Sequence, residues 1–387
     1  MNVRLVQLDG KYPNIALMKL AHYHKAKGDF VHVTRQVYPE LFEPPYDVVY
    51  GSAIFDFTSA KLAAFRLQWP NAIVGGTGSG SGAPLTVEQL IGRDYEHYDY
   101  SGWPVCRVSL GFTQRGCRMA KSPICRRFCV VPQKEGHPRP LNTIAQIWRG
   151  EPWPKKLLLL DNDFFGNPDW RARLREIQDG HFRVCFWQGI NTRLISQESA
   201  EALASIEYRN SRFSERKLYT AWDNIGDERI FFQGVERLER AGIPPNRLMA
   251  YMLVGCDPEE TWPRIWYRFR KMVECGIEPY PMVFRRTRED LLCFQRWVVR
   301  GLYRKIAWPE YRRKTKTRES VIGWREIYGA AATTHTAHLQ GTEKNEQAEE
   351  QKRCHPAARH LSGGRHDDCS APCVRDDHAL GGNRPRV

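Results

Sequence analysis

The sequence lacks any long apolar run. Its longest aliphatic stretch, Leu157 to Leu160, is followed at once by Asp161, whereas a membrane-spanning helix needs about 20 apolar residues. The N-terminus also lacks the basic start, apolar middle and small-residue cleavage site of a secretory signal peptide. We therefore expect a cytoplasmic protein that does not associate with a membrane.

Cysteine is too sparse for a disulfide scaffold, with 11 in 387 residues. In a reducing compartment, clustered cysteines are more typical of metal binding. Hydrophobic residues make up 42% and charged residues 26%, which excludes a collagen or a coiled-coil rod and is typical of a soluble globular protein. At about 150 residues per domain, the length favours two or three domains.

Aromatic residues are absent from residues 331–387, and large aliphatic residues are few there. Such a segment cannot bury enough apolar surface to offset its chain entropy, so we predict a disordered tail. The tail holds eight Lys or Arg and eight Asp or Glu, so the formal net charge of +14 belongs to residues 1–330. This excess of positive charge is consistent with a nucleic-acid partner.

Residues 1–95 alternate short apolar stretches with helical ones. We expect strands at 3–8, 31–33, 47–50 and 72–74, and helices at 15–27 and 62–68. This alternation predicts an α/β domain with a parallel sheet covered on both faces. The glycine-rich turn at 75–82 lacks the spacing of a dinucleotide-binding loop, and we expect it to be a flexible connection.

Residues 96–286 repeat the alternation with longer spacing. We expect strands at 107–111, 156–160, 183–187, 217–221, 248–254 and 278–284. Helices are expected at 196–206, 227–241 and 259–275, the last two ending at Gly242 and Gly276. Six strands joined by helices predict a partial (β/α)6 barrel, whose chemistry belongs at the carboxyl ends of its strands.

A basic helical extension is predicted at 287–330. The stretch from 285 to 325 holds thirteen Lys or Arg and four Asp or Glu, interleaved with aromatic residues such as Trp297 and Trp308. One interpretation is a surface that grips phosphates, and the other is a solvated helical face.

The strongest chemical signal is a cysteine cluster after the first predicted barrel strand. Cys117, Cys125 and Cys129 can hold three irons of a [4Fe-4S] cluster and leave the fourth iron open. A small molecule with an amino and a carboxylate group can chelate that iron and bring a sulfonium close to the cluster. This arrangement suits one-electron cleavage of S-adenosylmethionine, a chemistry that the cofactor supplies.

Two stretches, Gly116-Cys117 and residues 128–136 (Phe-Cys-Val-Val-Pro-Gln-Lys-Glu-Gly), resemble the radical S-adenosylmethionine superfamily, in the branch with a cobalamin-binding-like N-terminal domain. The resemblance covers about residues 3–286. It implies a Rossmann-like N-terminal domain, a radical barrel, a [4Fe-4S] cluster, and an external electron donor of the ferredoxin or flavodoxin type. The ligand spacing departs from the family, since C-x7-C-x3-C replaces the usual C-x3-C-x2-C.

The resemblance also implies contacts to S-adenosylmethionine. Asp161 and Asp163, after the second strand, correspond to groups that meet the methionine amino group, although a simple turn is the alternative. Asp223, after the fourth strand, could accept from the ribose hydroxyls. Gly255 corresponds to a close approach of the adenine, and Glu259 follows it, although Glu259 and Glu260 also suit the first turn of a helix.

The N-terminal domain lacks the histidine of the cobalamin-binding signature. The matching turn, residues 9–14, reads Asp-Gly-Lys-Tyr-Pro-Asn, which argues against a cobalamin ligated by the protein. His22, His24 and His32 are interpreted as helix or strand residues rather than as ligands.

Two alternatives stay open. Cys106 could join the three cysteines in a structural zinc site, although it precedes the strand that the others follow. The protein could also be a nucleic-acid-binding protein whose metal is structural. Our first expectation is a radical S-adenosylmethionine enzyme with an unspecified substrate.

Overall fold

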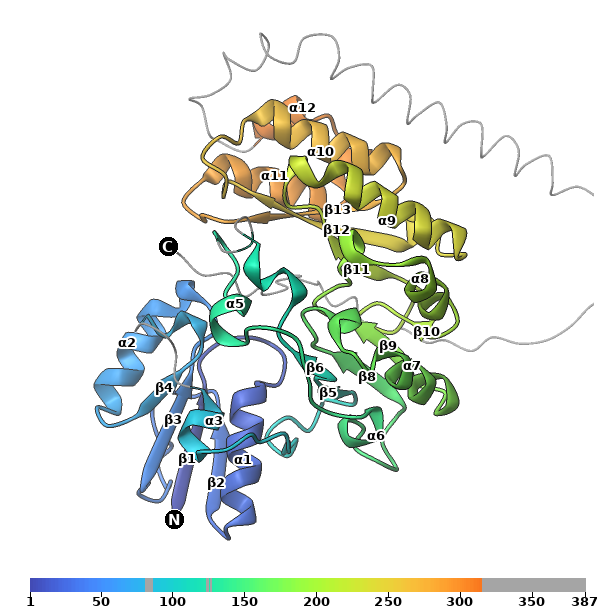
Figure 1. Ribbon diagram of the computed structural model, residues 1–387. Helices are drawn as coiled ribbons and strands as arrows, with labels where there is room; N and C mark the ends of the chain where they lie inside the picture. Colours follow the sequence, from blue (N-terminus) through green and yellow to red (C-terminus); the bar gives the residue numbers. More distant parts are fainter. Residues whose placement is uncertain (81–85, 123–124, 126, 315–387) are drawn as a thin grey trace, which may run out of the picture. The chain divides into compact units, whose positions relative to one another are not determined.

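A computed structural model describes residues 1–80, 86–122, 125 and 127–314, and Figure 1 shows their secondary structure. The described chain forms two compact units. The first comprises Met1–Met252 and Glu259–Glu278, and the second comprises Leu253–Pro258 and the described residues from Pro279 onward. The predicted tail at 331–387 lies outside the described residues.

The N-terminal sheet has four parallel strands in the order β2-β1-β3-β4, the order in which a doubly wound sheet begins. The strands are β1 (Asn2–Gln7), β2 (Phe30–Thr34), β3 (Val48–Ser52) and β4 (Ile73–Gly75). The helices that go with them are α1 (Ile15–Ala26), α2 (Ser59–Gln68) and α3 (Val87–Ile91). The parallel sheet predicted for residues 1–95 is present, with its strands and both predicted helices.

Both faces of this sheet are covered, and β1 is buried along nearly its whole length, including the polar residues Arg4 and Gln7. On one face, Leu62 and Phe65 of α2 pack against Val6 and Val49. Helix α1 contacts β1, β2 and β3 and buries Leu17 on its sheet-facing side. His22 and His24 lie in α1 and His32 lies in β2, as expected.

The glycine-rich turn after β4 is packed against the chain, so the expectation of a flexible connection is wrong for residues 75–80. Gly76 has φ +97°, and a Cβ there would lie 2.1 Å from Ala53 O. A Cβ on Gly78 would lie 2.3 Å from Phe55 O. The two glycines are needed because the loops after β3 and β4 approach each other at backbone distance.

A second parallel sheet follows, in the order β10-β9-β8-β5. Its strands are β5 (Ser109–Gly111), β8 (Lys156–Leu159), β9 (Arg183–Phe186) and β10 (Glu207–Tyr208). Strand β11 (Leu218–Ala221) pairs in parallel with β12 (Leu248–Val254), and β13 (Glu278–Val283) is the last strand. The helices after α3 in the first unit are α5 (Val131–Lys134), α6 (Ile144–Ile147), α7 (Trp170–Asp179), α8 (Gln197–Ala204), α9 (Glu228–Arg240) and α10 (Trp262–Glu274).

All six strands predicted for residues 96–286 are therefore present, in two sheets. The amide of Ile190, after β9, donates to Tyr219 O of β11 at 2.8 Å. An α/β architecture of parallel sheets is confirmed, and the barrel remains a prediction. Gly242 and Gly276 have φ values of +90° and +75° and follow α9 and α10, as predicted.

The start of α10 differs from the prediction. The helix begins at Trp262 with Thr261 as its N-cap, so Glu259 and Glu260 lie before the helix and not in its first turn. Pro263 at the second helical position fits this later start, because its missing N–H is not needed there.

The second unit contains the helical extension, with α11 (Glu289–Val299) and α12 (Trp308–Lys314). Trp297 and Trp308 are each only 4% exposed, and their ring centroids lie 5.4 Å apart. These tryptophans are core residues, so they are not available to stack on nucleic-acid bases. Arg296, Arg300 and Arg304 are exposed.

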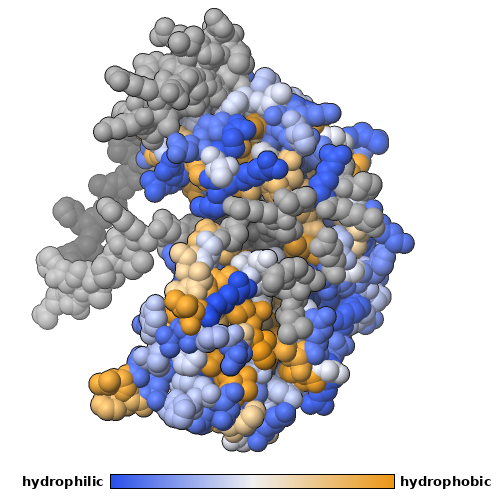
Figure 2. Space-filling model, turned by 90° about the vertical axis from the view of Figure 1, so that its left-hand side faces the viewer, coloured by the Kyte–Doolittle hydropathy of each residue, from blue (hydrophilic) through white to orange (hydrophobic). Residues whose placement is uncertain are grey.

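Figure 2 shows hydrophobic side chains gathered on the lower part of one face, at the height of the N-terminal sheet in Figure 1. Phe42 and Leu41, in the connection from β2 to β3, and Leu67 of α2 are strongly exposed hydrophobic residues of this region, at 96%, 83% and 85%. No helix in the described part of the chain has the length and apolar character needed to cross a bilayer.

Candidate functional site

The cysteine loop, residues 114–140, follows β5, and its two ends are paired with each other, an arrangement called the clasp below. Its ends form a two-stranded antiparallel pair, β6 (Gln114–Arg115) with β7 (Arg139–Pro140). Just inside this pair, Cys117 N donates to Gly136 O at 3.2 Å. The loop is therefore closed at its base, at the carboxyl end of β5, where the chemistry of a parallel sheet is expected.

Gly116 is required at the base of the loop. Its φ is +91°, and a Cβ there would lie 2.1 Å from His137 O. Only glycine adopts this conformation so close to another backbone without strain.

The three predicted cysteines lie on this loop as thiols and are not paired in disulfides with one another. Cys129 N donates to Cys125 O at 2.8 Å, so these two cysteines lie one helical turn apart. Cys125 is buried, whereas Cys117 and Cys129 are partly exposed. Burial is the largest cause that raises the pKa of Cys117 to about 12, and negative charge on Asp163, Cys129 and Cys125 adds to the effect. The three thiols therefore interact electrostatically.

Asp163, one of the predicted site residues, anchors the start of the cysteine loop. It is 1% exposed and forms a two-pronged ion pair with Arg118, the residue after Cys117. Both side-chain contacts measure 2.8 Å, and the Arg118 amide donates to the same carboxylate at 3.0 Å. This side chain is thus fully engaged with the residue next to a candidate ligand.

Asp161 holds the strand end that leads into the loop. Its Oδ1 accepts from Thr113 Oγ1 at 2.9 Å and from Gln114 N at 2.6 Å. Its Oδ2 is buried and has no hydrogen-bond partner among the residues that the structure describes, and the same is true of Gln114 Oε1. Burial is the largest cause that raises the pKa of Asp161, to about 7. Near neutral pH this carboxyl is therefore present in both its protonated and its ionised form.

Glu135 completes the anchoring at the other end of the loop. One carboxylate oxygen accepts from Gly116 N at 3.0 Å and from Asn162 Nδ2 at 2.9 Å, and the other pairs with Arg115 at 2.8 Å. Asp161, Asp163 and Glu135 therefore connect the cysteine loop to the end of β8. The contacts of Glu135 were not predicted, although Glu135 lies inside the stretch 128–136 that carries the family resemblance.

Arg193, which sequence reasoning missed, lies in the turn after β9. It pairs with Asp227 at 2.7 Å. Burial is the largest single cause and lowers the pKa of Arg193, but the hydrogen bond and the charge of Asp227, together with smaller effects of other groups, outweigh it and the net shift is upward. Cys125 and Asp223 also raise this pKa, which places Arg193 within electrostatic range of a candidate iron ligand and of the predicted ribose contact.

The turn after β11, which carries Asp223, is held from behind by a buried arginine. Arg268 of α10 donates to Asp223 O at 2.9 Å and to Trp222 O at 3.2 Å, and it pairs with Glu260. Arg268 and Glu260 side chains are 2% and 8% exposed, whereas the predicted Glu259 is 86% exposed. The buried partner of Arg268 is therefore Glu260, whereas the sequence analysis had singled out its neighbour Glu259.

Gly255 has φ +75°, and a Cβ there would lie 2.7 Å from Leu291 Cδ1. Packing within the second unit therefore accounts for this glycine.

Cys106 lies at the other end of β5 from the cysteine loop. Its carbonyl accepts from Arg149 Nη1 at 2.8 Å, and burial raises the pKa of its thiol. Across the described ranges, no three His, Cys, Asp or Glu side chains stand close enough together to share one metal ion.

No protein-family model matches the chain, and no curated protein or solved structure matches it either.

Proposed function

We propose that this protein is a radical S-adenosylmethionine enzyme that binds a [4Fe-4S] cluster through Cys117, Cys125 and Cys129. One observation supports the proposal: three cysteine thiols, two of which raise the pKa of the third, lie on one loop that is closed at its base at the carboxyl end of a parallel sheet. Three thiolates are one fewer than the usual four of such a cluster, which leaves one iron for a small-molecule ligand.

The donor set fits this cofactor in number and chemistry. Cys117 resists ionisation in the protein alone, because burial and the neighbouring acidic groups raise its pKa. A bound metal reverses that preference, since a coordinating thiol is deprotonated outright. A bound iron would therefore compensate the negative charges of the three thiolates.

When bound, the cluster supplies one electron that breaks the sulfur–C5′ bond of S-adenosylmethionine, giving methionine and a 5′-deoxyadenosyl radical that removes a hydrogen atom from the substrate. The protein's own residues hold the backbone beside the cluster-binding cysteines in place. Asp163 and Arg118 fix the backbone next to Cys117, and Glu135 fixes Gly116. An external donor of the ferredoxin or flavodoxin type supplies the electron in this proposal.

The predicted contacts to S-adenosylmethionine take different roles in this proposal. Asp161 and Asp163 act as positioning residues, because their hydrogen bonds go to the cysteine loop and its approach. Asp223 remains a predicted ribose contact, presented by a turn that Arg268 holds. Gly255 and Glu259 remain predictions.

The test is anaerobic reconstitution of the full chain with iron and sulfide. We expect a broad visible charge-transfer absorbance and, with a strong reductant, production of 5′-deoxyadenosine from S-adenosylmethionine. Cys117→Ala, Cys125→Ala and Cys129→Ala should each lose both signals. Cys275→Ala, a partly exposed cysteine at the end of α10, is the matched control and should keep them.

Cys106→Ala separates the cluster from the zinc alternative. A cluster on three cysteines leaves this variant unchanged, whereas an all-cysteine zinc site would lose its metal. Zinc in the purified protein together with loss of zinc in Cys106→Ala would disprove the enzyme proposal.

Nucleic-acid binding is a second candidate function, favoured by the net charge of +14 and by the exposed Arg296, Arg300 and Arg304. These cations can contact phosphates, while the buried tryptophans beside them cannot contribute stacking. Affinity for single-stranded RNA that falls steeply with salt, and that drops when the three arginines are replaced by glutamine, would support it.

A further inference from the structure

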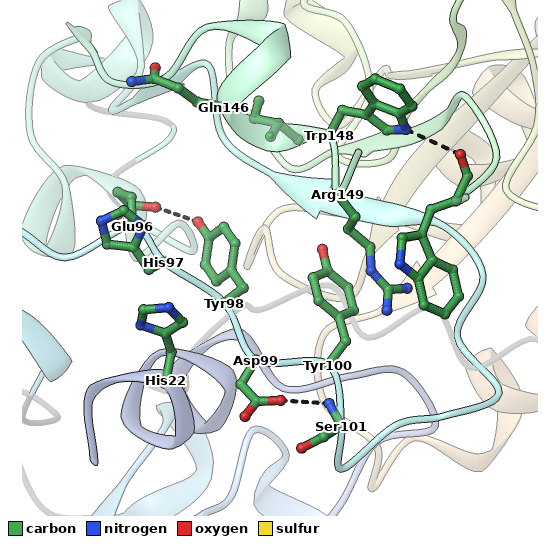
Figure 3. Close-up of a pocket in the computed structure, with 12 residues that line it drawn as sticks. His22, Glu96, His97, Tyr98, Asp99, Tyr100, Ser101, Gln146, Trp148 and Arg149 are labelled. Atoms are coloured by element: carbon green, nitrogen blue, oxygen red, sulfur yellow. Dashed lines mark hydrogen bonds between the residues drawn. The ribbon is translucent and has the colours of Figure 1, made fainter. Parts of the chain in front are cut away.

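A pocket that is open to solvent lies in the first unit, and no residue of the cysteine loop lines it. Its volume is about 570 Å³, within the usual range of about 300–1,000 Å³ for a small-molecule site. It borders β5 at the end opposite the cysteines, because Arg149 of its lining donates from its amide to Ser109 Oγ at 3.2 Å. Figure 3 shows His22, Glu96 and His97 on one side, Trp148 and Arg149 on the other, and Tyr98 and Tyr100 between them.

Arg149 is a fixed guanidinium that no acidic group neutralises. Its Cζ lies 3.8 Å from the ring centroid of Tyr100 and 3.4 Å from that of Trp153. Its Nη1 donates to Cys106 O at 2.8 Å, and no carboxylate pairs with it in the part of the chain that the structure describes. The stacked rings hold the guanidinium plane in place, and its remaining N–H groups suit a phosphate or carboxylate.

The acidic residues in the lining already have partners. Glu96 pairs with Lys19 at 2.5 Å and accepts from the Tyr98 hydroxyl, and Lys19 also pairs with Glu88. Asp99 pairs with Lys25 at 2.7 Å. These carboxylates are therefore engaged with lysines and do not neutralise Arg149.

The remaining walls are planar. Trp148 is held by a bond from its Nε1 to Trp153 O at 3.3 Å, and the rings of His22 and His97 stack at 5.1 Å. Aromatic side chains of this kind bind nucleobases by stacking, whatever the base.

We propose that this cavity binds a nucleotide, with its phosphate on Arg149 and its base against Tyr98 and Trp148. The nucleotide can be free or can be the end of an RNA strand, since both present the same phosphate and base. The site is separate from the cysteine loop and does not depend on iron or S-adenosylmethionine.

The experiment is calorimetric titration of the full chain, without added iron or S-adenosylmethionine, with AMP and with UMP. A six-nucleotide adenylate RNA distinguishes a strand from a free nucleotide. Adenosine and inorganic phosphate are the component probes. We expect at least one of AMP, UMP and the RNA to bind, and each component alone to bind at least 10-fold more weakly.

Arg149→Met should weaken binding by about 10-fold or more, because a hydrogen-bonded charge is lost. Arg171→Met is the matched control: Arg171 also stacks on a tryptophan, Trp170 at 4.4 Å, but it is paired with Glu198 and lies outside the cavity.

Gln146→Glu tests the site without altering Arg149. Gln146 lines the cavity and closes the capping box of α6, and glutamate serves that box equally well. The added negative charge should weaken nucleotide binding several-fold. Gln89→Glu is the control, because Gln89 is the equivalent residue of the capping box in α3 and lies outside the cavity.

Three results would each overturn the proposal, and two of them concern binding of the nucleotides themselves. One is the absence of binding of AMP, UMP and the RNA to the unmodified protein. The other is binding that neither Arg149→Met nor Gln146→Glu reduces relative to its control. Phosphate alone binding as tightly as AMP would also overturn it, since the base would then contribute nothing.

Discussion

The carboxyl edges of the N-terminal sheet and of the sheet β10-β9-β8-β5 use aspartate in different ways. After β1, Asp9 accepts from the amides of Ile54 and Phe55 at 2.9 and 2.8 Å and from Thr58 Oγ1 at 2.8 Å. After β8, Asp161 bonds through one oxygen only and leaves the other buried without a partner, while Asp163 pairs with Arg118. At the first edge, hydrogen bonds from nearby amides and a hydroxyl engage the aspartate carboxylate, whereas at the second edge one buried carboxylate oxygen has no hydrogen-bond partner in the described part of the chain.

This difference identifies which edge is suited to chemistry. A doubly wound sheet binds ligands where neighbouring strands diverge, between β1 and β3 here, yet Asp9 already occupies the amides at that place. The second edge carries three thiols, a buried unpaired acceptor and a raised pKa, which are features that cluster at functional sites.

The largest expected loss of stability comes from replacing a glycine with alanine at either edge. Gly116→Ala and Gly76→Ala place a Cβ at the same 2.1 Å from a backbone oxygen, with φ values of +91° and +97°. Each should lower the free energy of unfolding by about 3–5 kcal/mol, measured by urea denaturation. Gly116→Ala should also abolish iron uptake, whereas Gly76→Ala protein that folds should keep it. Equal iron content in the two variants would contradict the assignment of function to the second edge.

Next in size is the buried pair behind the β11 turn. Glu260→Gln leaves Arg268 charged and buried, which should cost about 3 kcal/mol of unfolding free energy. Glu259→Gln is the control, since this side chain is 86% exposed and its nearest cation lies 3.9 Å away, so its cost should be near zero. Thermal unfolding of the two variants measures the contrast, and similar midpoints would show that the pair is not structural.

A smaller effect is expected for the two engaged aspartates. Asp163→Asn and Asp9→Asn each remove a negative charge that accepts from several donors, and each should lower the free energy of unfolding by about 2 kcal/mol. The cost at Asp163 stays moderate because its partner Arg118 is 35% exposed and partly solvated. Iron content separates them, because only Asp163 fixes the residue next to Cys117. Reconstituted Asp163→Asn with a full complement of iron would show that the loop does not need this anchor.

The smallest effect concerns pH. The pKa of Asp161 in the folded protein, about 7, is above its ordinary value, so the folded state keeps a proton that the unfolded chain releases. This group therefore reduces stability as pH rises from about 4 to about 7, and its contribution is constant above that. Asp161→Asn should match the unmodified protein at pH 5 and exceed it by about 1 kcal/mol or more at pH 8. Parallel stability curves for the two proteins would rule out a raised pKa.

The strands of both sheets could be predicted because each is a short apolar run closed by turn residues. Leu157 to Leu159 shows this pattern, and β8 ends before Asp161 as expected. The start of α10 was missed because two glutamates before a helix resemble its first turn, although Thr261 and Pro263 are the better signal.

The roles of the side chains at the site were less predictable. The cysteines were found from their spacing, but the contacts of Asp161 and Asp163 to Thr113 and Arg118 join residues at least 45 positions apart. Such contacts leave no periodic signal in one sequence. The same holds for Arg149, whose stacking on Tyr100 depends on how two loops meet.

The clasp at the base of the cysteine loop bears on its unusual length. Because Gln114 and Arg115 are tied to Pro140 and Arg139, insertions between these points do not change where the chain enters and leaves the sheet. Closing a somewhat longer loop costs little additional entropy. The spacing between the sulfurs can therefore change without moving the ends of the loop.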